Sequence, residues 1–422
     1  MSETELHVDK ATLGGRALHE DRSILRKENL LMLVLASIQF TYILDFVIIM
    51  PLGPQFMRVF EVSSQQFGLI VSSYTLSAGF SGLIGAFYID RFDRKPALLT
   101  LYAGFAVGTG MCAFAPTYEF LVAARLLAGS FGGVLGSLVL AIVGDIIPYA
   151  RRGAAMGVIT SAFSVASVAG VPTGLYIAAH LGWHATFLAL AGLCVLILLV
   201  AVWIVPSIRG HLVDSVSRHP LETLKVMLFN RNHTRVFLFV AMLMFGGFTV
   251  FPFISPYLVY NLGIQESDLT YVYGLGGLFT IFTSRIIGKL ADRYGKPRVF
   301  GIVASLSAIP TLAVTSLPAM ALPWVLVCTT FFFILASGRS VPAFAMITAS
   351  VDSSLRGSFM SFNSSIQMWS AGLASFAAGV LITNGPHGEL FRYGWVGVMA
   401  SSSTIACVFL ANRLKQPDVS HQ

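Results

Sequence analysis

The strongest constraint on the fold is a series of long apolar runs that recurs along almost the entire chain. A helix needs roughly 20 mostly apolar residues to cross a membrane. Twelve runs of that kind can be read, at 29–51, 65–89, 96–115, 118–147, 152–178, 184–206, 234–260, 268–291, 299–318, 322–348, 357–383 and 393–413. The 422 residues are 55% hydrophobic and only 11% charged, whereas a soluble domain carries about 25% charged residues. The sequence therefore predicts an all-α membrane protein with twelve transmembrane helices.

The positions of lysine and arginine predict the orientation in the membrane. Cytoplasmic loops are enriched in these residues, and here they gather in residues 1–28, in alternate loops and in 207–233. We therefore expect a bacterial cytoplasmic (inner) membrane protein with cytoplasmic tails at 1–28 and 414–422. The net charge of +7 then follows the inner membrane surface, so lipid is the expected neighbour and nucleic acid is not.

The two halves of the chain repeat each other. "IDRFDRKPAL" follows the second run and "ADRYGKPRVF" follows the eighth, and Asp90 and Asp292 are 202 positions apart. Arg152 and Arg356 are 204 positions apart in a second matched pair. We predict two six-helix bundles, at 29–206 and 234–413, joined by a central cytoplasmic loop at 207–233. Duplicated bundles are typical of transporters, which bind their substrate between the halves.

The loop after the eighth run resembles the cytoplasmic loop motif of the major facilitator superfamily. Its residues Gly288, Asp292, Arg293, Gly295 and Lys296 match that motif position for position. The first-half copy keeps Asp90, Arg91, Arg94 and Lys95, but has Ala86 and Asp93 where the motif has glycines. The resemblance implies the major facilitator fold and a cytoplasmic gate in which an arginine pairs with an acid such as Asp145. The alternative is that the basic residues serve topology alone.

Two glycine-rich patches resemble motifs of one branch of that superfamily. In "ARLLAGSFGGVLG", Arg125 is followed by glycines on the same helix face. "AGVPTG" contains Gly170, Pro172 and Gly174, and resembles the glycine–proline motif of antiporters, although Val171 interrupts it. The whole stretch is similar to drug:proton antiporters and arabinose-efflux-type permeases. Helix packing alone is the alternative explanation for these glycines.

Among the twenty acidic residues, Asp45 is the one that lies deep in an apolar run. A charge near the middle of a bilayer costs roughly 2.5–3.5 kcal/mol on insertion scales, so such residues usually have a function. The resemblance implies that the first and fourth helices, which carry Asp45 and Arg125, both line a central cavity. We therefore predict that Asp45 is the proton-coupling site and Arg125 its modulator. A static buried ion pair is the alternative.

The sequence also offers candidates for the wall of a substrate cavity, chosen as polar or aromatic groups on helices expected to line it. They are Thr41, Tyr42, Tyr74, Phe245, Phe248, Arg339, Asn363 and Gln367.

The predicted function is proton-coupled efflux of a drug, sugar or amphipathic metabolite by a monomer. The alternatives are a proton symporter or a uniporter that imports a nutrient and, more distantly, a membrane receptor. We expect no enzymatic activity, cofactor or metal site, because the sequence contains no P-loop motif and its four cysteines are widely spaced.

Overall fold

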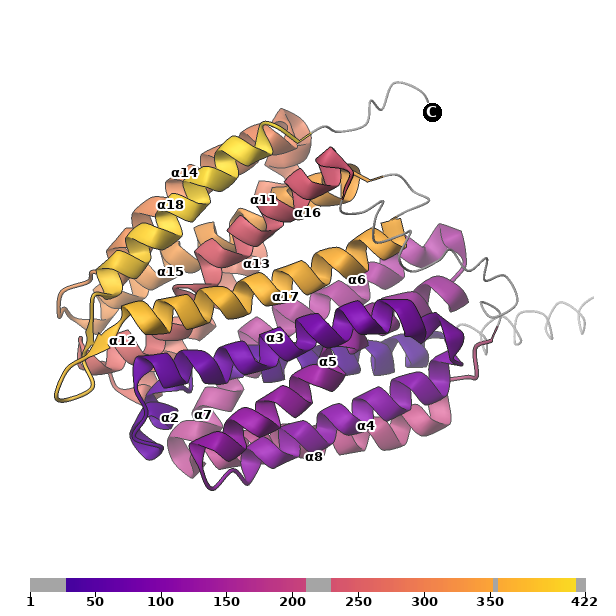
Figure 1. Cartoon of the computed structure of the whole chain (residues 1–422), viewed down its shortest axis with the longest axis horizontal. Helices are drawn as coiled ribbons and strands as arrows, with labels where there is room; N and C mark the ends of the chain where they lie inside the picture. The colour runs from indigo at the N-terminus through magenta and orange to yellow at the C-terminus, as the bar shows by residue number, and fades with distance from the viewer. Residues whose placement is uncertain (1–27, 210–228, 352–355, 415–422) are drawn as a thin grey trace, which may run out of the picture.

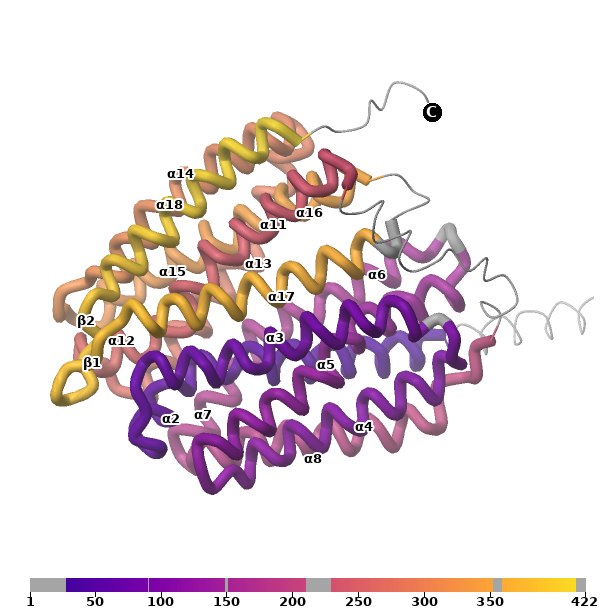
Figure 2. The backbone as a smooth tube through the Cα atoms, viewed as in Figure 1, coloured from indigo at the N-terminus to yellow at the C-terminus, as the bar shows by residue number. Residues whose placement is uncertain are grey.

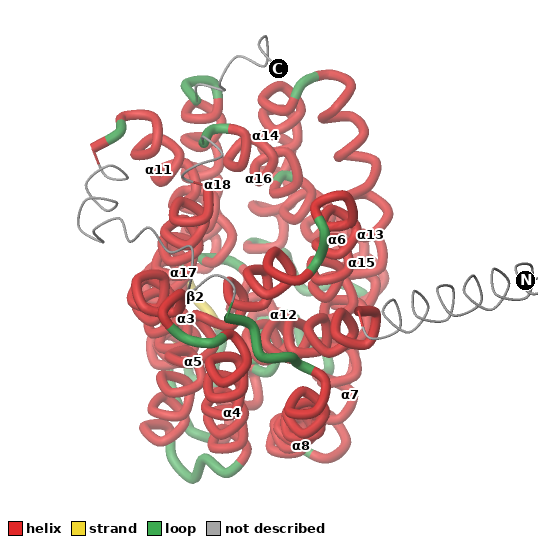
Figure 3. The backbone as a smooth tube through the Cα atoms, turned by 90° about the vertical axis from the view of Figure 1, so that its right-hand side faces the viewer, coloured by secondary structure: helices red, strands yellow, loops and turns green. Residues whose placement is uncertain are grey.

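The computed structural model describes residues 28–209, 229–351 and 356–414, apart from the side chains of residues 90, 149, 150 and 356–358. Most of the predicted tails and of the predicted central loop therefore lies outside the described residues. Almost all of the described chain is helical (Figure 3).

The first half consists of six membrane-length helical stretches with short connections. They comprise Glu28–Ile48, α2 (Gly53–Val59), α3 (Ser64–Tyr88), η1 (Ile89–Arg91), α4 (Arg94–Ala113), α5 (Tyr118–Ile146), α6 (Tyr149–Val165), η2 (Ala166–Gly170), α7 (Val171–Leu181) and α8 (Trp183–Ile204). Side-chain caps fix several starts: Ser63 and Gln66 form a capping box before α3, and Thr117 accepts a hydrogen bond from the Phe120 amide at the start of α5.

The second half repeats this plan. It comprises α11 (Arg231–Phe248), η3 (Phe251–Phe253), α12 (Ile254–Tyr260), η4 (Glu266–Asp268), α13 (Leu269–Tyr294), α14 (Lys296–Thr315), α15 (Leu322–Gly338), α16 (Ser340–Ala349), α17 (Arg356–Leu381), β1 (Thr383–Asn384), β2 (Leu390–Phe391) and α18 (Tyr393–Ala411). The two strands pair antiparallel as a small hairpin beside α12 (Figure 2).

Ten of the described helices are long and apolar enough to cross a membrane. The other two, α13 and α17, run between the same two ends of the molecule (Figure 1). All twelve predicted spans thus correspond to helical stretches. We call the end that carries Arg94, Arg151 and Arg231 the basic end, and the opposite end, with α2 and α12, the closed end.

Corresponding helices of the two halves are broken at matching places. The first helix ends at Ile48 and resumes as α2, and α11 ends at Phe248 and resumes as η3 and α12. Prolines at positions 54, 252 and 256 lie at these restarts, where a missing backbone N–H costs least. The breaks place short helical turns of both halves at the closed end.

The halves pack against each other along α3 and α17 (Figure 1). A Cβ atom on Gly68 would lie 2.8 Å from the carbonyl oxygen of Ser375, and one on Gly379 would lie 2.7 Å from that of Ser64. Glycine is therefore required for this close backbone approach, as is common between membrane helices. Viewed from the basic end, the helices of the two halves gather on opposite sides of this contact (Figure 3).

Polar contacts join the halves at the closed end. Glu266 of the second half accepts hydrogen bonds from Gln55, at 2.9 Å, and from Arg58. The Tyr260 hydroxyl donates to the carbonyl of Pro54 at 2.9 Å. One large apolar cluster combines buried side chains of both halves here, whereas the buried members of the two clusters nearer the basic end each come from one half. The halves are thus joined at the closed end and diverge toward the basic end (Figure 1).

Candidate functional site

Asp45 and Arg125 form an ion pair inside the first half. Nη1 of Arg125 lies 2.7 Å from Oδ2 of Asp45, and it also approaches the Asp45 carbonyl at 3.4 Å. The other carboxylate oxygen accepts a hydrogen bond from the Thr109 hydroxyl of α4 at 3.1 Å. Both charged side chains are completely buried. The sequence predicts both partners, and the structure brings them into direct contact.

Tyr74 of α3 completes the surroundings of the arginine. The Arg125 guanidinium lies over the Tyr74 ring, 4.3 Å from its centroid, which is a favourable cation–π distance. Nε and Nη2 of Arg125 and the Tyr74 hydroxyl have no hydrogen-bond partner within the described residues. Gly132 makes room for this arrangement, because a Cβ there would lie 2.7 Å from the Tyr74 hydroxyl. Because the two opposite charges are paired, the site is neutral overall. The unpartnered N–H groups of Arg125 and the Tyr74 hydroxyl remain available for water or a ligand.

A row of aromatic rings connects this pair to the second half. The Tyr74 ring stacks on Phe46 with centroids 5.7 Å apart, and Phe46 meets Phe248 across the boundary between the halves at 5.6 Å. Phe248 in turn contacts Phe251 at 6.1 Å. Phe46 and Phe248 are both half-buried. The ion pair thus lies two rings away from the contact between the halves.

The other predicted cavity residues lie in different surroundings. Thr41 is fully buried in the first half and its hydroxyl is 2.9 Å from that of Tyr102, which does not support a place in the wall between the halves. Tyr42, Phe245 and Gln367 are half-buried. Asn363 is fully buried, and neither atom of its amide has a partner within the described residues.

Arg339 lies where α15 ends and α16 begins. It is 4% exposed. Its Nη1 atom donates to the hydroxyls of Thr404 and Ser307, the latter at 3.4 Å. It therefore lies inside the second half, among α14, α15 and α18, and has no carboxylate partner within the described residues.

The predicted gate residues all lie at the basic end. Nε of Arg94 is 2.9 Å from Oδ2 of Asp145, so this expected pairing is present in the structure. The Arg91 guanidinium lies over the Tyr88 ring at 5.2 Å, and that of Arg293 over the Tyr294 ring at 5.3 Å. The side chain of Asp90 lies outside the described residues. Asp292 and Lys296 flank the turn at Gly295, and Gly288 lies two turns before it on α13.

Asp93, which departs from the loop motif, has a role of its own. It caps α4 by accepting from the Lys95 amide at 3.0 Å, and it binds the Ile208 amide at 3.1 Å and Nε of Arg209 at 2.9 Å. Hydrogen bonds from the Ser207 hydroxyl and from these groups hold the Asp93 pKa below its usual value. The carboxylate therefore ties the segment after α8 to the start of α4.

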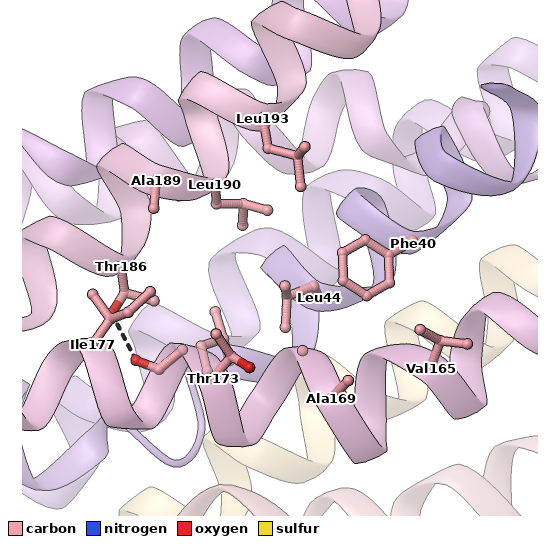
Figure 4. A pocket seen from close by; sticks show the side chains of 13 residues that line it. Phe40, Leu44, Val165, Ala169, Thr173, Ile177, Thr186, Ala189, Leu190 and Leu193 are labelled. Atoms are coloured by element: carbon pink, nitrogen blue, oxygen red, sulfur yellow. Dashed lines mark hydrogen bonds between the residues drawn. The ribbon is translucent and has the colours of Figure 1, made fainter. Parts of the chain in front are cut away.

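The antiporter-type motif forms the junction between η2 and α7. A π-helical turn at Ala166–Gly170 precedes Pro172, and a Cβ on Gly170 or Gly174 would approach Leu44 or Ile48 of the first helix to 3.0 or 2.8 Å. A cavity of about 240 Å³ opens beside these glycines, between the first helix, α7 and α8 (Figure 4). Its walls are apolar apart from Thr173 and Thr186, and Thr186 donates to the Gly174 carbonyl at 2.8 Å. The motif thus controls how closely the first helix packs on its neighbours.

Sequence reasoning missed Thr109, Phe46, Ser307 and Thr404. A hydroxyl inside an apolar run was the only available signal for the three hydroxyl residues. Phe46 is one of 33 phenylalanines, and nothing in the sequence separates it from those that pack in the core.

The comparisons with known proteins all point to one family of transporters. The sequence model of the Major Facilitator Superfamily matches residues 35–249 and 236–421. The chain is 24% identical over 345 residues to the uncharacterized MFS-type transporter YbcL of Bacillus subtilis (strain 168), covering 81% of this chain and 86% of that protein.

It is also 24% identical over 242 residues to a probable sugar efflux transporter of Helicobacter pylori (strain HPAG1), covering 56% of this chain and 60% of that protein. The crystal structure of a D-xylose–proton symporter superposes with a TM-score of 0.75 at 15% identity, over 93% of this chain and 99% of that one. At this low sequence identity, the superposition shows that the two proteins share a fold and nothing more.

Proposed function

The chain belongs to the Major Facilitator Superfamily, and from this premise we propose that it is a proton-coupled antiporter that exports a small molecule by alternating access. The observation that carries the proposal is the fully buried pair of Asp45 and Arg125, with Thr109 on the second carboxylate oxygen. A structural ion pair this deep in a membrane is expensive, and the antiporter-type glycines pack on the same helix as Asp45.

We assign the basic end to the cytoplasm, because lysine and arginine concentrate on that side of membrane proteins. The chain then lies in a bacterial cytoplasmic membrane with both termini inside. The closed end faces outward, so the described state is open toward the cytoplasm. Residues 29–206 and 234–413 act as two bodies that rock about the contact between α3 and α17.

Asp45 supplies the proton-binding step in this proposal. Apolar surroundings favour a protonated carboxyl, while a nearby arginine favours a carboxylate. When Asp45 takes up a proton, the pair loses its attraction and Arg125 is free to bind elsewhere. Tyr74 and Phe46 link the arginine to Phe248 of the other half, so this change acts on the contact between the halves.

Transport by the purified chain in proteoliposomes with an imposed pH gradient tests the proposal. A gradient of one pH unit can sustain about tenfold accumulation per exchanged proton. We expect a substrate from a panel of drugs, sugars and amphipathic metabolites to accumulate on the acidic side. Sugars are included because of the printed name of the Helicobacter pylori relative. Accumulation on the alkaline side would favour the alternative, a symporter, and indifference to pH would favour a uniporter.

Asp45→Asn separates coupling from a static role. The amide keeps the shape and cannot ionise, so we expect a folded protein that exchanges substrate at equal concentrations but shows no accumulation driven by the gradient. Glu119→Gln, an exposed carboxylate-to-amide change on α5, is the matched control and should behave as the wild type. Gradient-driven accumulation by Asp45→Asn would refute the role assigned to Asp45.

A further inference from the structure

Arg339 is a buried cation that has no acidic partner in the part of the chain that the structure describes. The helices around it, α11, α14, α15, α16 and α18, contain no aspartate or glutamate at all. The guanidinium does not lose its proton in proteins, and an unpaired buried charge is strongly unfavourable. In the first half the same problem is solved by Asp45, which neutralises Arg125. Within the described residues, only dipoles are available to offset the charge of Arg339.

The hydrogen bonds of Arg339 satisfy only part of its guanidinium. Nη1 donates to the hydroxyls of Ser307 and Thr404, which donate onward to the carbonyls of Ala304 at 2.7 Å and Ala400 at 2.9 Å. These relays spread some of the positive charge onto two helices. Nε is buried and has no partner, and Nη2 makes no hydrogen bond within the described residues. The Nε–Nη2 edge, which binds oxyanions and other anions with two parallel N–H groups, is therefore unused.

The surroundings of this edge also suit a small ligand. Gly247 lies beside it, since a Cβ there would be 3.7 Å from Nη2 of Arg339. Ser401 precedes Thr404 by one turn of α18 and has a buried hydroxyl without a partner within the described residues, although only Thr404 contacts Arg339. α11 ends here, at Phe248, whereas the helix formed by α15 and α16 keeps its backbone hydrogen bonds through Arg339, to Leu335 and from Ala343. Interrupted helices supply ion and substrate sites in transporters because they expose backbone groups inside the membrane.

We propose that the unused edge of Arg339 binds one anionic group inside the second half. The ligand group carries one negative charge. It either offers two acceptor atoms to the two N–H groups or is a spherical ion. Two sources share that chemistry: a free monovalent anion such as chloride, and the acidic group of a transported substrate. This inference stands apart from proton coupling, because it concerns a different half of the molecule and a different charge.

Thermal unfolding of the full chain in lipid nanodiscs, followed by tryptophan fluorescence, tests this site. Chloride is added stepwise to a low-salt buffer that contains no carboxylate anion, and in a second arm acidic compounds and their amide analogues are added to the same buffer without chloride. We expect the wild-type unfolding temperature to rise along a single-site saturation curve. A rise with chloride identifies the inorganic anion, and a rise with the acids but not their amides identifies a substrate group.

Variants assign the effect to Arg339. Arg339→Gln should abolish the anion-dependent rise, whereas Arg285→Gln, the same change at an exposed arginine of α13, should retain it. Arg339→Lys keeps the charge but lacks the two-donor edge, so the same rise in unfolding temperature should require at least about tenfold more anion. This variant takes the place of Arg339→Gln as the test if the glutamine variant does not fold. Asp45→Asn should retain the full response, which separates this site from the proposed coupling.

Two results would overturn the proposal. One is a wild-type unfolding temperature that is equal in the chloride-free buffer, in chloride and with every acidic compound. The other is an anion-dependent rise of undiminished size in Arg339→Gln.

Discussion

Within the described residues, each half holds one buried arginine away from the basic end, Arg125 and Arg339, and the two halves neutralise it differently. In the first half Arg125 binds Asp45 at 2.7 Å, and in the second half Arg339 binds only hydroxyls. At the offset of 202 to 204 residues that relates the halves, Asp45 corresponds to positions 247–249 and Arg125 to positions 327–329. None of these six residues is charged. The two halves thus share the helical scaffold, but their buried charges stand at positions that do not correspond.

The largest expected effect comes from removing Arg125, and removing Arg339 provides the comparison. Arg125→Met leaves Asp45 buried without its partner, so we expect the free energy of unfolding to fall by about 3–5 kcal/mol. Arg339→Met leaves no charge behind, and Ser307 and Thr404 keep their bonds to helix carbonyls. In chloride-free buffer its unfolding free energy should therefore change by no more than about 1 kcal/mol. Unfolding in mixed detergent micelles measures both values.

The double variant Asp45→Asn/Arg125→Met provides the control. It removes the whole charge pair, so most of the stability lost in Arg125→Met should return. If Arg125→Met and Arg339→Met were equally destabilising in chloride-free buffer, the contrast between a paired and an unpaired arginine would be wrong.

The same contrast shows how far sequence reasoning reaches. The spans, the repeat and the isolation of Asp45 follow from hydrophobicity and position along the chain, and both partners of the buried pair could be named in advance. The contacts of Asp45 with Thr109 and of Phe46 with Phe248 depend on how each helix is rotated and how closely it crosses its neighbour. Thr41 illustrates this limit: it lies one helical turn from Asp45, yet its hydroxyl meets Tyr102 instead of the boundary between the halves.

The two copies of the loop motif give a smaller contrast. Gly295 has φ +92°, a left-handed conformation that other residues rarely adopt, whereas Asp93 has φ −56°. We expect Gly295→Ala to lower the free energy of unfolding by roughly 1–2 kcal/mol. Asp93→Gly meets no such conformational barrier, so its effect should be local. It removes the carboxylate that binds residues 207–209, and faster amide hydrogen exchange in that segment would detect the change. Strong global destabilisation by Asp93→Gly would contradict this assignment.

Acid should reproduce the local effect in the wild type. The Asp93 pKa is held below its usual value by the hydrogen bond from Ser207 and by those from Arg209 and two backbone amides. A carboxylate with a lowered pKa stabilises the folded form above its ordinary pKa, and loses this contribution as the pH falls toward the lowered value. Protection of residues 207–209 should therefore persist at neutral pH and decline only in strong acid.

The smallest expected change in stability, but a clear change in shape, concerns the closed end. Glu266 joins the halves through Gln55 and Arg58, and the Arg58 side chain is 58% exposed, so Glu266→Gln should cost less than about 1 kcal/mol. Because this contact is specific to the state in which the closed end is shut, its loss should shift the population toward separation of the halves there. Spin labels at Val59 and Ser267, in a variant whose cysteines are replaced, should report a larger fraction of long distances.

Glu389→Gln removes a charge at the same end, but Glu389 binds within its own hairpin, to the His387 amide. The distances should therefore stay unchanged in that variant, and an equal shift in both would mean that net charge, and not the contact between the halves, holds the closed end together.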